Sequence, residues 1–129
     1  PDMAYYKFAE KIKSNKPLTI YNEGNMERDM THIEDISDGI LACINKNNFN
    51  SNHEIFNLGN SNPVGTMELL KTIELHYGKK ADVIFKSSSD EVKITYADIS
   101  KSLNILNFKP KIKFNQGIKE FLDWYDKTF

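Results

Sequence analysis

The chain has 129 residues, of which 40% are apolar and 12% aromatic, with a formal net charge of -1. This size suits one domain with a single moderate core, and the interspersed 17 basic and 18 acidic residues create no field that would attract nucleic acid or a membrane surface. A lone cysteine, Cys43, excludes an internal disulfide framework and favours a small buried hydrophobe in a reducing cytoplasm, and no run approaches the roughly twenty apolar residues that cross a bilayer.

The amino end begins with helical periodicity. Apolar residues recur at helical spacing through residues 2–13, and Asp2 is expected to cap this helix. The β-branched and aromatic run 18–21 predicts a strand, followed by turn residues at 22–25. Residues 29–33 predict a brief extended piece before the next helix.

A second helix is predicted over residues 34–46, with acidic residues in its first turn, where the helix dipole favours them. Its inward face is expected to consist of Ile36, Ile40, Leu41 and Ile44. Residues 53–59 then predict a strand that ends at Gly59. The core-facing residues of this strand are expected to be Ile55, Phe56 and Leu58.

Thr66 is expected to cap a third helix over residues 67–78, which Gly78 ends as a left-handed terminator. The inward residues of this helix are expected to be Met67, Leu70, Ile73 and either Leu75 or Tyr77. Residues 81–85 predict a strand and residues 92–95 a short extended segment.

The last third of the chain predicts two more helices. Asp98 caps a short helix that runs to residue 106, and Pro110 keeps residues 109–114 extended. A final helix covers 115–129, with an inward face of Ile118, Phe121, Leu122 and Tyr125. Helices thus alternate with strands too short for a self-standing doubly wound sheet, which indicates a small mixed α/β (α+β) unit.

The sequence lacks three familiar catalytic or phosphate-binding motifs. There is no phosphate-binding G-x-x-x-x-G-K-[ST], no H-E-x-x-H and no G-x-S-x-G. The glycines of "NLGNSNPVG" have the wrong spacing for a dinucleotide fingerprint, and Pro63 interrupts them, so a plain loop is predicted. Residues His32, Glu34 and Asp35 do not converge well on one ion at their spacing, and no metal is expected.

Other titratable residues are assigned to the surface. His53 and His76 lack a second ligand at metal-binding spacing, so each is predicted to face solvent or cap a helix. Asp123 and Asp126 lie three residues apart and predict a solvated helix face rather than a catalytic carboxylate pair.

Arg28 is the single arginine in a chain with sixteen lysines. Its guanidinium is a flat, permanently charged fork that grips phosphate or carboxylate through two parallel hydrogen bonds, which ammonium does not do. Two interpretations follow from the sequence: Arg28 binds an anionic ligand, or it ties down Asp29, Glu27 or a helix end.

Five motifs in order carry a family resemblance. They are "PDMA", "PLTIYNEGNMERDMTHIEDISDGI", "NLGNSNPV", "TYADISK" and "FNQGIKEFLDWY". Together they resemble, over practically the whole chain, the C-terminal part of UDP-glucuronate 4-epimerases, which are extended short-chain dehydrogenases/reductases.

The resemblance implies a two-part enzyme. An N-terminal Rossmann domain holds NAD and a Tyr-x-x-x-Lys pair, and a smaller C-terminal region closes over the nucleotide sugar. The complete enzyme moves a hydride from C4 of the sugar to NAD and returns it to the other face of the 4-keto intermediate. No tyrosine of this chain has a lysine four residues on, so we expect the Rossmann domain, the NAD site and the catalytic residues to be missing.

The resemblance also implies a ligand site without metal. Arg28 is expected to contact the diphosphate of the UDP-sugar, and Thr19 and Tyr21 to surround the uracil. In similar enzymes a Gly-Asp pair before "TYAD" binds the ribose; here Asp90 stands at the glycine position and Glu91 at the acid, so either one is a candidate.

Three further residues have roles implied by the family. Ser88 stands where galactose epimerases place a second phosphate-binding arginine. Asp29 is expected to orient Arg28 or the backbone beside it, and Asp35 to cap or charge the helix that follows.

The sequence therefore favours residues 1–129 as the nucleotide-sugar-binding part of an NAD-dependent epimerase whose ligand is UDP-glucuronate or UDP-galacturonate. The chain starts at a helix entrance without an initiator Met, so we expect a piece of a longer protein. Its partner would be its own Rossmann domain, and the apolar face left uncovered would favour a homo-oligomer. The alternatives are a non-catalytic module that binds a nucleotide sugar or a protein, and part of a related UDP-sugar decarboxylase or dehydratase.

Overall fold

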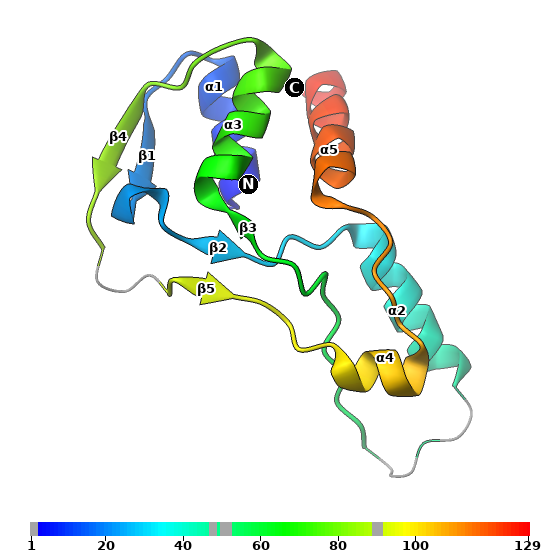
Figure 1. Ribbon diagram of the computed structural model, residues 1–129. Coiled ribbons are helices and arrows are strands. Elements are labelled where there is room, and N and C mark those ends of the chain that lie inside the picture. The colour runs from blue at the N-terminus through cyan, green and yellow to red at the C-terminus, as the bar shows by residue number, and fades with distance from the viewer. Residues whose placement is uncertain (1–2, 47–48, 50–52, 89–91) are drawn as a thin grey trace.

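The computed structural model describes residues 3–46, 49, 53–88 and 92–129 of the chain. Helices alternate with short strands, which confirms the predicted mixed α/β class (Figure 1). In chain order the elements are α1 (Ala4–Lys13), β1 (Leu18–Tyr21), the 3-10 turn η1 (Asn22–Gly24), β2 (Glu27–Arg28), α2 (Ile33–Asn45), β3 (Val64–Gly65), α3 (Thr66–Tyr77), β4 (Val83–Lys86), β5 (Ile94–Thr95), α4 (Ser100–Leu106) and α5 (Phe114–Thr128).

The core lies where α1, α3 and α5 pack against the parallel pair of β1 and β4 (Figure 1). The pair begins with Leu18 opposite Val83 and ends with Tyr21 opposite Lys86. Parallel neighbours need a crossover, and α3 precedes β4 in that crossover. The buried core cluster consists of Phe8, Ala9, Ile12, Leu18, Ile20, Leu69, Leu70, Ile73, Ile118, Leu122 and Tyr125.

A second, very short sheet borders this core. Its strand order is β3-β2-β5, with β2 antiparallel to β3 and parallel to β5. Extended segments lead from this sheet to α2 and α4, which lie together at the far end of the molecule from α1 and α3 (Figure 1). The two-residue strands are too short to hold these segments by backbone bonds alone.

The prediction for the inward face of α2 is wrong for Ile40, Leu41 and Ile44, whereas Ile36 is partly buried. Ile40 is 50% exposed and Ile44 is 70% exposed, whereas the buried residues of α2 are Asp35 and Gly39. The helix packs closely through Gly39, where an added Cβ would lie 2.7 Å from Leu58. The apolar face predicted from periodicity is therefore left without cover in the described part of the chain.

The predicted strand at 53–59 is also not observed. Residues 53–58 form no strand, and Ile55 is 69% exposed, although Phe56 and Leu58 are partly buried. Strands are stable only when neighbours complete their backbone hydrogen bonds, and no described strand lies beside this segment. Residues 53–58 therefore form no strand, although their residue types favour one.

Helix termini agree in part with the prediction. Gly78 ends α3 with φ +61°, and Asp98 Oδ1 accepts a hydrogen bond from Ser100 N at 2.9 Å at the start of α4. Bonding to Ser100 also holds the pKa of Asp98 below its usual value. Thr66, in contrast, is the first residue of α3 and donates from Oγ1 to Met26 O at 3.0 Å, so it ties α3 to β2. Asp2 lies outside the described residues.

Two burial predictions need correction, and one open alternative is decided. Met67 of α3 is 41% exposed. Of the alternatives Leu75 and Tyr77, Tyr77 packs against the core and Leu75 is 73% exposed. Cys43 is only partly buried, as expected for a helix whose far face is uncovered.

Candidate functional site

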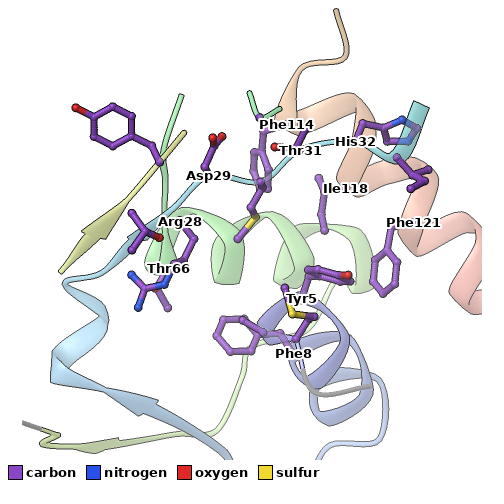
Figure 2. Close-up of a pocket in the computed structure, with 18 of the residues that line it drawn as sticks. Tyr5, Phe8, Arg28, Asp29, Thr31, His32, Thr66, Phe114, Ile118 and Phe121 are labelled. Carbon is purple, nitrogen blue, oxygen red and sulfur yellow. The ribbon is translucent and has the colours of Figure 1, made fainter. Parts of the chain in front are cut away.

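A cavity of about 1110 Å³ opens between the strand segments and helices α1 and α5. Figure 2 shows Arg28, Asp29 and Thr66 on the strand side of this cavity and Tyr5 and Phe121 on the helical side. The strand side is rich in polar groups, with Thr19, Tyr21, Arg28, Asp29, Thr31, Thr66, Thr95 and Tyr96. The helical side is aromatic, with Tyr5, Phe8, Phe114, Phe121 and Trp124. This division suits an amphipathic ligand or a ligand together with an apolar protein surface.

Three of the predicted ligand residues line the cavity together: Thr19, Tyr21 and Arg28. Strand alternation explains why the first two share a side, because Leu18 and Ile20 point into the core and Thr19 and Tyr21 away from it. Tyr21 is 41% exposed, so its ring is accessible.

Arg28 is held by main-chain carbonyls. Its Nη1 donates to Val92 O at 2.7 Å and to Glu27 O at 2.9 Å, and its Nη2 lies 4.0 Å from Met26 Sδ. These contacts place the guanidinium at the cavity wall. Two main-chain carbonyls thus help to orient the side chain.

The carboxylate of Asp29 binds backbone rather than Arg28. Its Oδ2 accepts from Ser61 N at 3.0 Å and from Ala97 N at 3.1 Å. Asp29 therefore joins extended segments on both sides of β2, which is the backbone role expected as one of its two alternatives.

Asp90 and Glu91 lie outside the described residues, so their expected role at the ribose stays a prediction. Ser88 is partly buried and its N donates to Asn22 Oδ1 at 2.8 Å. This bond fastens the end of the β4 segment to the turn after β1.

His32 closes the other end of the cavity wall. Its Nδ1 accepts from Glu34 N at 3.3 Å and caps α2, and its Nε2 lies 3.2 Å from Glu120 Oε2 on α5. No group of three metal-ligating side chains occurs among the described residues. His32 thus caps α2 and links it to α5.

Asp35 has a long-range role that its sequence position did not reveal. It is 2% exposed, and its carboxylate accepts from Lys111 N at 2.9 Å and Ile112 N at 3.1 Å. The expected charge in the first turn of α2 is present, and it also fixes the segment that leads into α5 along the cavity.

Asp126 is exposed, as predicted, but it has partners that its place in the sequence did not indicate. It accepts hydrogen bonds or ion pairs from Lys13 Nζ at 2.9 Å, His76 Nε2 at 3.0 Å and Tyr77 Oη at 3.0 Å. Burial opposes ionisation, but these three donors hold the pKa of Asp126 below its usual value. Burial first, and the bond to Asp126 second, raise the pKa of Tyr77.

The remaining surface predictions concern Asp123, His53 and His76. Asp123 forms an exposed pair with Lys119 at 2.7 Å, and His53 is exposed. His76 is exposed, as predicted, and its ring also links α3 to Asp126.

The chain is similar to proteins of one known family. Residues 1–59 match the model of the NAD dependent epimerase/dehydratase family. A Methanocaldococcus jannaschii protein described as uncharacterized is 48% identical over 97% of this chain and 38% of its own length. The UDP-glucuronate 4-epimerase of Thermodesulfobacterium geofontis is 35% identical over 96% of this chain and 38% of its own length.

A solved structure has the same fold. The UDP-glucuronic acid 4-epimerase of Bacillus cereus, in complex with UDP-glucuronic acid and NAD, is 30% identical and superposes with a TM-score of 0.90 over 100% of this chain and 41% of that chain. The chain thus spans about two fifths of the length of the relatives it matches. None of the described helices is long and apolar enough to cross a membrane. Over nearly its whole length, the chain is similar to UDP-glucuronate 4-epimerases, and its first 59 residues match the NAD dependent epimerase/dehydratase family.

Proposed function

We propose that this chain is the nucleotide-sugar-binding part of an NAD-dependent UDP-sugar 4-epimerase, with UDP-glucuronate or UDP-galacturonate as its ligand. The observation that carries the proposal is the single arginine held by backbone carbonyls at the wall of a cavity of about 1110 Å³, with Thr19 and Tyr21 on the same wall. The names of the relatives support the choice of glucuronate.

Each residue has a distinct task in this proposal. The Arg28 guanidinium neutralises the pyrophosphate and orients it through paired N–H donors. The strand that carries Thr19 and Tyr21 supplies backbone groups and an aromatic side chain beside the uracil. Asp90 or Glu91 binds the ribose hydroxyls.

The chemistry of the complete enzyme needs groups beyond this chain. NAD, when bound to the Rossmann domain, supplies the site to which a hydride from C4 is transferred and from which it returns. The residues described here bind and orient the nucleotide, and the aromatic wall excludes water from the apolar side of the cavity. A chain without a Tyr-x-x-x-Lys pair performs binding and not turnover.

Replacement of Arg28 tests the proposal directly. In the complete protein we expect Arg28→Lys to weaken UDP-glucuronate binding about tenfold, because the charge is kept but the forked contact is lost. Isothermal titration calorimetry measures the dissociation constant. Lys119→Arg, on the exposed pair with Asp123, is the matched control and should leave it unchanged. Equal affinity in wild type and Arg28→Lys would contradict the proposed site.

Because we propose that NAD and the catalytic residues belong to the rest of the enzyme, we expect the isolated chain to be inactive. With NAD and UDP-glucuronate, we expect no UDP-galacturonate from residues 1–129 alone, by chromatography of the nucleotide sugars. Product formed by the isolated chain would refute this expectation.

The absence of the Tyr-x-x-x-Lys pair also favours a second candidate function, a non-catalytic module that binds a nucleotide sugar or a protein. The complete protein separates the candidates, because an epimerase interconverts UDP-glucuronate and UDP-galacturonate. A related decarboxylase would instead release CO₂, and a binding module would return the substrate unchanged.

A further inference from the structure

The residue next to Arg28 joins three chain segments that border the cavity. Asp29 Oδ2 accepts from Ser61 N and Ala97 N, and Asp29 N donates to Thr95 O at 3.1 Å. One residue therefore fastens β2 to the segment before β3 and to the end of β5.

This fastening matters because the sheet is so short. Each ladder of β2 contains two residue pairs, with Arg28 opposite Val64 on one side and Thr95 on the other. Two pairs leave the register of a strand weakly defined, whereas a carboxylate that accepts two backbone N–H bonds adds charge-assisted contacts at a fixed position.

The register of β5 in turn determines the direction of the guanidinium. Arg28 Nη1 donates to Val92 O, which lies two residues before β5 on the same segment. A slip of that segment along β2 would carry this carbonyl away from Arg28. We propose that Asp29 is a positioning residue for Arg28, acting through the register of β2 and β5; this inference rests on the proposed function of Arg28 in diphosphate binding.

Gly59 packs into the same junction. A Cβ added there would lie 2.5 Å from the Cβ of Ala97 and 2.7 Å from Asp29 Oδ2, and Gly59 is buried. Gly59→Ala therefore displaces the junction sterically and leaves the charge of Asp29 in place. This substitution therefore disturbs the junction without removing the Asp29 carboxylate.

The two oxygens of Asp29 differ in a way that makes the test selective. Both hydrogen bonds end on Oδ2, whereas Oδ1 is buried and has no hydrogen-bond partner among the described residues. The single oxygen of an asparagine can accept both N–H bonds with its two lone pairs. Asp29→Asn should therefore keep the junction, and Asp29→Ala should lose it.

The experiment measures UDP and UMP binding to the complete protein by calorimetry. We expect Asp29→Ala and Gly59→Ala to weaken UDP binding about tenfold but UMP binding only about twofold, because UMP has one phosphate fewer for the misaligned guanidinium to hold. Asp29→Asn should stay within about threefold of wild type for both nucleotides.

A matched carboxylate separates positioning from general stability. Glu74 accepts from Ala81 N at 2.8 Å and from Lys80 Nζ at 2.8 Å, away from the cavity-lining residues. Glu74→Ala should lower the melting temperature and leave the ratio of UMP to UDP dissociation constants unchanged.

The outcomes distinguish failure of the proposed function from failure of the positioning role of Asp29. If the wild-type protein binds no UDP, the proposed function is overturned and this inference with it. If wild type binds UDP and both Asp29→Ala and Gly59→Ala keep the wild-type ratio, the positioning role alone is overturned. If Asp29→Ala does not fold, Gly59→Ala and Asp29→Asn still decide the question.

Discussion

Asp126, near the end of α5, accepts contacts from two other helices. Lys13 comes from α1, and His76 and Tyr77 come from α3. A single carboxylate thereby joins the three helices that surround the core. Because its side chain is 34% exposed, solvent screens these contacts and each is worth less than a buried pair.

We expect Asp126→Asn to lower the free energy of unfolding at pH 7 by about 1 kcal/mol. The folded-state pKa of Asp126 lies below the unfolded value, so its stabilisation is present above the unfolded pKa and is lost as pH falls through the folded pKa. The gap between wild type and variant should therefore close in acid.

Urea denaturation at a series of pH values measures that gap. Asp123→Asn is the control, because Asp123 forms an exposed pair with Lys119, and its effect should be smaller. A gap for Asp126→Asn that stays constant into strong acid would contradict the assigned contacts.

A glycine lies at each end of helix α3, and the two glycines differ in backbone conformation. Gly78 follows it with φ +61°, and Gly65 precedes it with φ -70°, while an added Cβ meets no atom within 4 Å at either position. The two sites therefore differ in backbone conformation and not in available space.

Gly78→Ala should lower the free energy of unfolding by about 1 kcal/mol, because an L-residue with a Cβ is strained in the left-handed region. Gly65→Ala should change it by less than half as much, since its backbone is allowed for any residue. Thermal denaturation of the two variants makes the comparison; equal losses would show that φ is not the cause.

The burial of α3 is equally one-sided. Ile73 is fully buried and Leu75 is 73% exposed, two positions further along the same helix. Ile73→Ala should lower the free energy of unfolding by about 2–5 kcal/mol because it removes core contacts and leaves a cavity, whereas Leu75→Ala should have little effect. Denaturant titration tests this pair, and a similar loss in both would contradict the observed orientation of α3.

At the scale of the whole molecule, the far end carries an uncovered apolar face. Ile33, Ile40 and Ile44 of α2 are 69%, 50% and 70% exposed, and Ile55 nearby in the chain is 69% exposed. Exposed apolar residues that follow helical spacing mark surfaces which protein normally covers. The chain spans about two fifths of the length of the relatives it matches.

The isolated chain is therefore expected to self-associate. Ile40→Glu with Ile44→Glu should shift it toward monomer in sedimentation velocity without lowering its melting temperature, because both side chains already contact water. Leu75→Glu, an equally exposed apolar position on α3, is the control and should leave the association state unchanged. Unaltered association in the double variant would exclude the α2 face as the contact.

Periodicity predicted most helices and the strand Leu18–Tyr21, because apolar spacing and capping are local properties that the chain shows before it folds. The lone Arg28 was also recognisable, since residue type alone distinguishes a guanidinium from sixteen lysines. Arg28 lines a cavity together with Thr19 and Tyr21, and its role there stays a prediction.

Local pattern failed where a residue's partner is remote. Lys13 and Asp126 are 113 positions apart, and Asp35 and Lys111 are 76 apart, so nothing near either carboxylate indicates its partner. The run at 53–58 has strand composition but no neighbouring strand, and pairing decides strand formation. Sequence by itself thus determined most helices and distinguished Arg28 from the lysines. Tertiary structure decided which carboxylates hold the fold and which apolar faces stay exposed, because those depend on distant segments meeting in space.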